Sequence, residues 1–304
     1  MAVYVKSGKT LNNLKEIPFE LERNLQNLVE DNLETVLNLK LIKSEFSIKD
    51  KRFDTLAFDT YTNSFVIIEY KRGKNFSVID QGMTYLGLLL DNKAEFILAY
   101  QDKFNKTIKK DDIHWDESRV IFVSTSFTDF QTSATFQNLP IELLQVNQYS
   151  NDIIITTPIR KTNASDDAVK ILSESKDKSF ENIAKEIKVY TEDDHLREAD
   201  EKTRELYEDL KSEILNLDSE IEVKPKKMYI AFKKQSNICD VRPLSKKETG
   251  LRIYVNAKVG TLDDPKHLFK DVSKVGHWGN GDYWIDITDD TEFAYIMKVL
   301  KTLL

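Results

Sequence analysis

Cysteine is almost missing from this sequence: Cys239 is the single cysteine among 304 residues. One thiol excludes an internal disulfide and any metal cluster built from cysteines. Apolar runs of membrane-spanning length are also absent, and the segment 1–5 is too short for the core of a signal peptide. We therefore expect a cytoplasmic protein that does not enter the membrane.

Histidine and glycine are too scattered to define a site. The glycines of segment 276–281 lack the following lysine of a phosphate-binding loop and favour a tight turn instead. Beside them, His277, Trp278 and Trp284 could stack nucleic-acid bases, but packing in the core of a small domain is the favoured interpretation. No histidine has the spacing of a metal-ligand set; the four are His114, His195, His267 and His277.

The charge is negative overall and unevenly distributed. A net charge of −7 and an isoelectric point of about 5.4 argue against a protein that coats nucleic acid. Acidic residues concentrate in segment 166–222, whereas basic residues surround segment 52–73. This asymmetry leaves two interpretations of the first half open, a nucleic-acid surface and an ordinary solvated surface. The basic residues are Lys40, Lys43, Lys49, Lys51, Arg52, Lys71, Arg72 and Lys74.

The hydrophobic pattern predicts an α/β domain over residues 1–160, with a mixed sheet flanked by helices. Leucine and valine recur at helical spacing over 19–39, with Glu30 at the border of the apolar stripe. The run VIIEY is typical of a central strand that is covered on both faces. Further expected elements are strands at 45–48, 53–59, 65–70, 94–100, 120–124 and 153–157, a helix at 78–90 that begins after Ser77, and a short edge strand at Tyr4 and Val5.

The second half predicts a charged linker over 161–201 and a smaller α+β domain over 202–304. Apolar residues between 196 and 217 recur at near-heptad spacing, and we favour one helix packed on this domain over a dimerising coiled coil because the heptads are few. Cys239 is interpreted as buried filler. The expected strands are 228–232, 238–242, 251–255 and 283–287, and a closing helix begins at Glu292.

The segment from Arg52 to Gly73 contains the clearest chemical pattern. Residues two apart on a strand point to the same face, so Glu69 and Lys71 project together and Tyr70 offers its carbonyl between them. Asp54 lies near the start of the preceding strand, which adjoins the end of the next strand in an antiparallel pair. An isolated E-x-K is usually a surface ion pair, but the apolar strand before Glu69 favours a position at the mouth of a core.

Two acids and an ammonium group at one strand end indicate a divalent cation, Mg²⁺ or Mn²⁺, bound by oxygen ligands. Asp54 and Glu69 should repel each other without metal, and at least one of them should have a raised pKa. Such an ion activates water against a phosphate. Glu30, from the packing helix, is a candidate third acid.

These residues resemble the PD-(D/E)xK nuclease superfamily, which implies a restriction-endonuclease-like fold. The resemblance assigns metal binding to Asp54, Glu69 and the Tyr70 carbonyl, with Glu30 acting on the metal or its water. Lys71 would position or deprotonate the attacking water. The superfamily's proline before the first acid is replaced by Phe53 here. Gln81 and Tyr85 match the Q-x-x-x-Y element of the RecB-like branch, whose i, i+4 spacing allows both to face the site.

The whole chain is similar to a group of bacterial proteins often labelled "predicted transport protein", through RFDTLAFD, VIIEYKRG and VIDQGMTYLGLLLDNKAEF. Their first domain resembles that of NucS-type DNA endonucleases, and their C-terminal domain has no settled role. The transport label finds no support in the sequence, because no segment has the length and apolar character needed to cross a membrane. The resemblance implies a Mg²⁺- or Mn²⁺-dependent endonuclease acting on DNA rather than RNA, in repair or defence against foreign DNA, and a homodimer. The expected nucleic-acid contacts are Lys51, Arg52, Arg72 and Lys74.

Two other classes stay open. The first is a non-catalytic protein that keeps the nuclease fold and binds nucleic acid, although intact Asp54, Glu69 and Lys71 argue against lost catalysis. The second is an interaction module whose acidic linker contacts protein partners.

Overall fold

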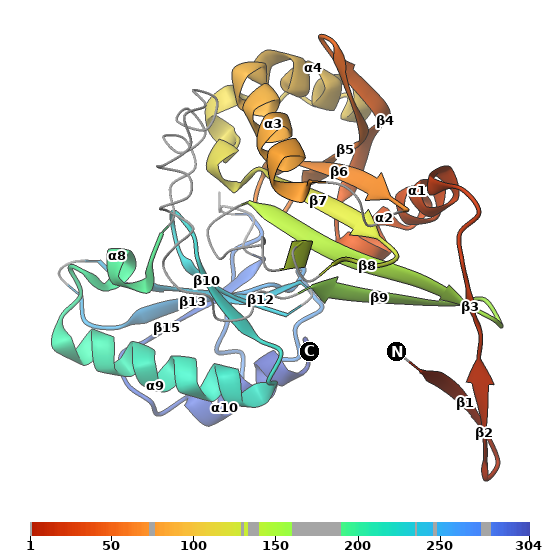
Figure 1. Cartoon of the computed structure of the whole chain (residues 1–304). Helices are drawn as coiled ribbons and strands as arrows, with labels where there is room; N and C mark the ends of the chain where they lie inside the picture. The colour runs from red at the N-terminus through yellow and green to blue at the C-terminus, as the bar shows by residue number, and fades with distance from the viewer. Residues whose placement is uncertain are drawn as a thin grey trace. The chain divides into compact units, whose positions relative to one another are not determined.

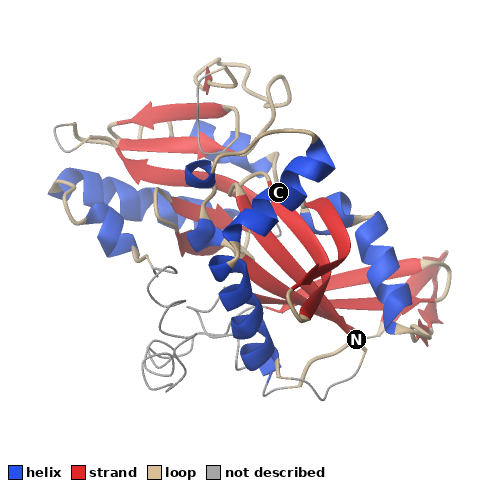
Figure 2. Cartoon of the chain, turned by 90° about the horizontal axis from the view of Figure 1, so that it is seen from above, coloured by secondary structure: helices blue, strands red, loops and turns tan. Residues whose placement is uncertain are grey.

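The computed structural model describes residues 2–72, 77–128, 131–132, 140–159, 190–234, 236–245, 248–274 and 281–304. The chain divides into two compact units, Met1–Ile187 and Lys188–Leu304. Figure 1 traces the chain, and Figure 2 distinguishes helices from strands, which both units contain. None of the helices in the described residues combines the length and the apolar character of a membrane span.

The N-terminal unit is built on a mixed seven-stranded sheet with the order β3-β8-β7-β6-β5-β4, to which β9 adds by pairing with β8. The β4–β5, β5–β6, β3–β8 and β8–β9 pairs are antiparallel, whereas β6–β7 and β7–β8 are parallel. The predicted mixed sheet is therefore confirmed. Its strands are β3 (Glu16–Ile17), β4 (Lys40–Ile48), β5 (Lys51–Asp59), β6 (Ser64–Lys71), β7 (Arg119–Ser124), β8 (Ile141–Tyr149) and β9 (Ile153–Ile159).

Helices cover both faces of this sheet. Alternate residues of β6 enter different cores: Ile67 packs with α3 (Val78–Asp91) and α4 (Lys93–Phe104), while Ile68 packs with the buried side of α1 (Glu22–Asp31). All of β6 except its last residue is buried, as predicted for a central strand.

Three local predictions differ from the structure. The helix predicted over 19–39 is divided at Asn32 into α1 and α2 (Leu33–Leu37). The segment predicted as a strand at 94–100 is the helix α4, which buries only Phe96 and leaves Leu98 57% exposed. Its alanine, glutamate and leucine residues favour a helix, and Asn105, with a φ of 50°, ends it. Strand β8 was not predicted.

The first residues form a β-hairpin instead of an edge of the main sheet. Strands β1 (Val3–Ser7) and β2 (Thr10–Leu14) pair antiparallel as a separate two-stranded sheet. A two-residue turn joins them, and Gly8 supplies the positive φ of 60° that its first position requires. The predicted short strand at Tyr4 and Val5 is therefore half of a hairpin.

The C-terminal unit is a smaller α+β structure. Its antiparallel sheet has the order β10-β11-β12-β13-β15-β14, and its core takes residues from α9, α10 and alternate positions of the strands. The helix predicted to pack on this domain is confirmed in part: Leu206, Leu210 and Ile214 of α9 enter this core, whereas Leu196 belongs to a separate short helix, α8. Its elements are α8 (Glu192–Leu196), α9 (Glu201–Leu217), β10 (Glu222–Pro225), β11 (Ile230–Lys233), β12 (Asn237–Pro243), β13 (Leu251–Val255), β14 (Lys270–Asp271), β15 (Tyr283–Ile287) and α10 (Phe293–Lys301).

Part of the segment predicted as linker belongs to this unit. Leu196 of α8 is buried in the C-terminal core, while residues 160–189 lie outside the described residues. Cys239 is fully buried, as interpreted from the sequence. Trp284 is not part of this core cluster, which corrects the position expected for it. Its ring packs against the Arg252 guanidinium instead, with 3.9 Å between the Arg252 Cζ and the ring centroid. His277 and Trp278 lie outside the described residues.

Candidate functional site

The end of β6 places a carboxylate and an ammonium group side by side. Lys71 Nζ lies 2.6 Å from Glu69 Oε1, and the Glu69 side chain is almost completely buried. The same oxygen accepts a hydrogen bond of 2.7 Å from Gln81 Nε2. Glu69 Oε2 is buried and has no hydrogen-bond partner among the described residues. A buried carboxylate oxygen without a donor is costly, and a bound cation is one way to satisfy it.

Asp54 joins this group from β5. Thr55 pairs with Ile68, and the same antiparallel register extended by one residue sets Asp54 opposite Glu69. Asp54 Oδ2 accepts a 2.9 Å hydrogen bond from the Tyr70 amide. Burial and the nearby Glu69 charge raise the pKa of Asp54 to about 6, against the opposing effects of the Tyr70 amide and Lys71. The structure thus brings Asp54, Glu69 and Lys71 together at one strand end.

Gln81 and Tyr85 reach the group from α3. This helix begins at the predicted place, since the Ser77 hydroxyl accepts from the Asp80 amide at 3.3 Å. Gln81 Nε2 also donates to the Tyr85 hydroxyl at 2.7 Å, and burial raises the pKa of Tyr85 to about 12. The Tyr85 ring packs edge-on against Phe53, with 4.8 Å between centroids, so the residue that replaces the expected proline supports Tyr85.

The Glu30 carboxylate shares the donor Gln26 with the Asp54 carbonyl but makes no contact with the Asp54 or Glu69 carboxylate. Its Oε1 accepts from Gln26 Nε2 at 3.0 Å and from the Thr55 hydroxyl, which in turn lies 3.4 Å from the Tyr70 hydroxyl. Successive side chains of a strand point to opposite faces, so Tyr70 lies on the α1 face of the sheet and Glu69 on the other. The contacts of Glu30 with Thr55 and Tyr70 are therefore on the face opposite to Lys71 and Gln81. Among the described residues, no group of three or more His, Cys, Asp or Glu side chains could hold a metal, so the expected third acid is not gathered with Asp54 and Glu69.

Two residues that the sequence did not indicate lie near Asp54, Gln26 as a hydrogen-bond donor to its carbonyl and Glu45 as a second negative charge. Gln26 is 4% exposed and its Nε2 donates to the Asp54 carbonyl at 3.0 Å. Glu45 lies where the β4–β5 ladder is interrupted opposite Asp54, has a φ of 53°, and is held by Arg23 at 2.5 Å and Arg52 at 2.8 Å. Gln26 precedes Glu30 by one helical turn, and this spacing was the available signal. Nothing in the sequence marks the positive φ.

The predicted nucleic-acid contacts are distributed around the same edge. Arg52 is paired with Glu45, and the Arg72 guanidinium donates to the Glu20 carbonyl while its amide donates to Glu22 at 2.9 Å. Lys51 is exposed, and Lys74 lies outside the described residues. The two arginines therefore already have protein partners.

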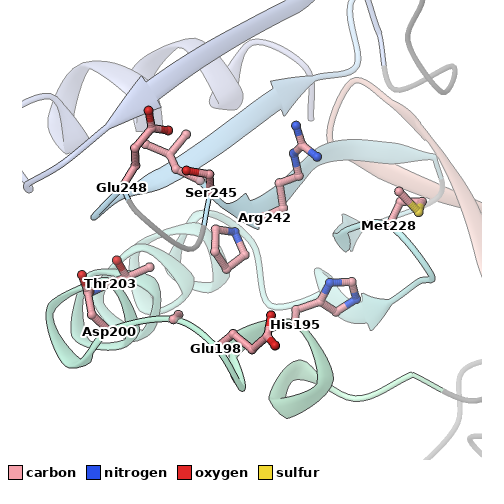
Figure 3. Close-up of a pocket in the computed structure, with 11 residues that line it drawn as sticks. His195, Glu198, Asp200, Thr203, Met228, Arg242, Ser245 and Glu248 are labelled. Carbon is pink, nitrogen blue, oxygen red and sulfur yellow. The ribbon is translucent and has the colours of Figure 1, made fainter.

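A separate cavity of about 190 Å³ lies in the C-terminal unit. Figure 3 shows His195 and Glu198 on the α8 side of this cavity, and Arg242 and Ser245 from the end of β12. The His195 imidazole Nε2 lies 2.6 Å from the Lys226 carbonyl, and burial lowers the pKa of His195. Asp200 at its edge caps α9, since its carboxylate accepts from the Thr203 amide at 2.7 Å.

Comparison with known proteins gives a family but no activity. Residues 192–302 match a family model described as a domain of unknown function (DUF5655). An uncharacterized protein of Haemophilus influenzae is 49% identical over 302 residues, which cover 99% of this chain and 98% of that protein. The chain belongs to the same family as that protein. The similarity to that protein therefore spans both units.

Three solved structures resemble parts of the chain at low TM-scores. A repair endonuclease from Pyrococcus abyssi is 21% identical, with a TM-score of 0.24, over 43% of this chain and 50% of that one. An EndoMS–dsDNA complex is 17% identical, with a TM-score of 0.26, over 46% and 49%. Pyrococcus furiosus SfsA with Ca²⁺ is 14% identical, with a TM-score of 0.28, over 54% and 77%. The chain spans about half of the two endonuclease structures, and these scores carry no weight for function.

Proposed function

We propose that this protein is a metal-dependent nuclease that hydrolyses phosphodiester bonds in nucleic acid. The observation that supports it is the group at the end of β6, where Asp54, Glu69 and Lys71 meet beside the amide of Gln81. For the fold of the N-terminal unit, we propose a restriction-endonuclease-like domain, because the two acids come from adjacent antiparallel strands of a sheet with helices on both faces.

The residues fit a divalent cation of the Mg²⁺ or Mn²⁺ type. Glu69 Oε2 has unused hydrogen-bonding capacity although it is buried. The raised pKa of Asp54 reflects burial first and repulsion from Glu69 second, and a bound positive charge would offset both. Asp54 and Glu69 would hold the ion, which supplies a polarised phosphate and a more acidic water. Glu30 is placed to support Thr55 and Tyr70 and is not proposed as a ligand.

The remaining groups have their own tasks. The Lys71 ammonium stabilises negative charge that develops on the phosphate or the attacking water. Gln81 keeps Glu69 Oε1 directed towards Lys71 and fixes the Tyr85 hydroxyl. DNA is the proposed substrate, in repair or defence, because the first domain resembles NucS-type DNA endonucleases through VIIEYKRG and the Q-x-x-x-Y pair.

A substrate panel tests the proposal. The full chain is incubated with labelled DNA and RNA in single-stranded, duplex, branched and mismatched forms, with Mg²⁺, Mn²⁺ or a chelator. We expect cleavage with metal by the wild type and by Glu205→Ala, which changes an exposed acid of α9, and none by Glu69→Ala. Absence of cleavage on every substrate would contradict the proposal, as would activity that persists in Asp54→Ala and Lys71→Ala.

A further inference from the structure

The β1–β2 hairpin has no partner sheet in the described residues. Figure 1 shows it reaching away from the seven-stranded sheet of its unit, and β1 and β2 pair only with each other. Nearly every hairpin side chain is exposed, with Leu14 at its base as the buried exception. Isolated two-stranded hairpins are only marginally stable in water, so an exposed one is expected to have a binding partner.

The base of the hairpin is fixed to the unit. The Lys15 amide donates to Ser150 Oγ at 3.2 Å, and the Ser150 amide donates to the Lys15 carbonyl at 2.8 Å. The following residue, Glu16, pairs with Tyr149 of β8 and accepts from Asn147 Nδ2 at 2.8 Å. The hairpin is therefore a ribbon projected from a defined point of the sheet.

Its charge differs from that of the whole chain. Residues 2–15 contain three lysines and no acidic residue, in a chain that has 51 acidic and 44 basic residues. The pairing of Lys6 with Leu11 and of Tyr4 with Asn13 places these four side chains on one face, and Lys9 lies in the turn. Tyr4 is 53% exposed and Leu11 is 62% exposed, so the face combines cations with accessible aromatic and apolar groups.

We infer that this hairpin binds duplex nucleic acid. A two-stranded ribbon fits the major groove, and lysines at its turn and on one face complement the phosphates on either side of a groove. The three lysines and the lack of any acidic residue in 2–15 complement a polyanionic groove, and a measurement of oligomeric state distinguishes a duplex from a second copy of the chain. The inference takes its ligand from the proposed function and adds a contact surface remote from the reacting groups.

The test compares two matched double variants of the full chain. Lys6→Gln/Lys9→Gln removes two charges from the hairpin, and Lys106→Gln/Lys109→Gln removes two exposed charges after α4. Binding of a fluorescein-labelled DNA duplex is measured by anisotropy in a chelator over a series of salt concentrations. We expect the hairpin variant to weaken binding about tenfold and to reduce the slope of log K against log salt by about 2, with no change in the control.

Several outcomes would overturn the inference: unchanged binding by the hairpin variant, equal weakening by both variants, or a change of oligomeric state by light scattering, which would assign the hairpin to a second copy. Failure of the nuclease proposal is separable. A wild type that cleaves nothing but loses duplex affinity selectively in the hairpin variant refutes catalysis and supports this surface. Metal-dependent cleavage with normal binding by the hairpin variant does the reverse.

Discussion

Each unit contains a lysine–glutamate ion pair with an N–O distance of 2.6 Å, and the two pairs have different surroundings. In the C-terminal unit, Glu192 Oε2 accepts from both Lys211 and the Tyr207 hydroxyl and so joins α8 to α9. In the N-terminal unit, Glu69 uses one oxygen for Lys71 and Gln81, and the other has no partner among the described residues. The Glu192–Lys211 pair therefore joins two helices, whereas the Glu69–Lys71 pair leaves one carboxylate oxygen able to bind a further group.

The carboxyl groups of the two units differ in the same sense. Burial would raise the pKa of Asp264, but hydrogen bonds from the Tyr295 hydroxyl and the Phe269 and Leu268 amides outweigh it and lower that pKa. Burial and Glu69 instead raise the pKa of Asp54. Charges that destabilise one another are retained where they serve binding or catalysis, whereas structural acids are surrounded by donors.

The largest expected difference between the two pairs is in activity. Lys71→Met should lower the rate of DNA cleavage by about 10²- to 10⁴-fold, because the ammonium group acts on charge that develops during the reaction. Lys211→Met, which breaks a pair of the same length, should leave the rate within about twofold of the wild type. Single-turnover cleavage measures both. Comparable losses in the two variants would show that the Lys71 effect is structural.

Asp54→Asn should stabilise the protein at neutral pH. The folded-state pKa of Asp54, about 6, lies above the unfolded value of 3.8, so the folded state holds the proton more tightly and wild-type stability falls as pH rises from 3.8 through 6. The variant lacks this decline and should be more stable at pH 7 by roughly 1 to 3 kcal/mol, a range that allows for solvent screening of a partly exposed group. Urea unfolding on both sides of pH 6 measures it, and parallel pH profiles of the two proteins would refute it.

A bound metal should stabilise the folded protein through the acids of the N-terminal unit and not through those of the C-terminal unit. Mn²⁺ at about ten times its dissociation constant should raise the free energy of unfolding of the wild type by about 1.4 kcal/mol, because the ion binds only the folded site. Glu69→Gln should lose this response, and Glu192→Gln should keep it. Thermal unfolding with and without Mn²⁺ makes the comparison, and an equal response in all three proteins would place the ion elsewhere.

The sequence predicted the β6 group because two simple rules sufficed. Alternation along a strand directs Glu69 and Lys71 to one face, and an antiparallel neighbour brings Asp54 beside them, as the register shows. The Ser77 cap similarly located the start of α3. Local rules were enough wherever the neighbouring residue lay on the same or the adjacent strand.

Long-range packing decided what the sequence left open. Glu30 lies at the border of its helix, and its direction depends on Thr55 and Tyr70, which are distant in sequence. The segment 94–100 has an apolar content compatible with either a strand or a helix, and the packing of Phe96 favours the helix. The hairpin was read as an edge strand because no pattern reveals whether a strand finds a partner in the main sheet.

The smallest expected effect concerns the structural pair itself. Lys211→Met keeps an unbranched side chain over the Tyr207 ring but removes the charge beside Glu192, and 24% of the lysine side chain is exposed. A partly exposed ion pair of this kind contributes about 1 kcal/mol or less, so the free energy of unfolding should fall by that amount. A double-mutant cycle with Glu192→Gln isolates the coupling between the two charges. Coupling well above this range would mean that Glu192 is strained without its lysine, and the C-terminal pair would then no longer contrast with the N-terminal one.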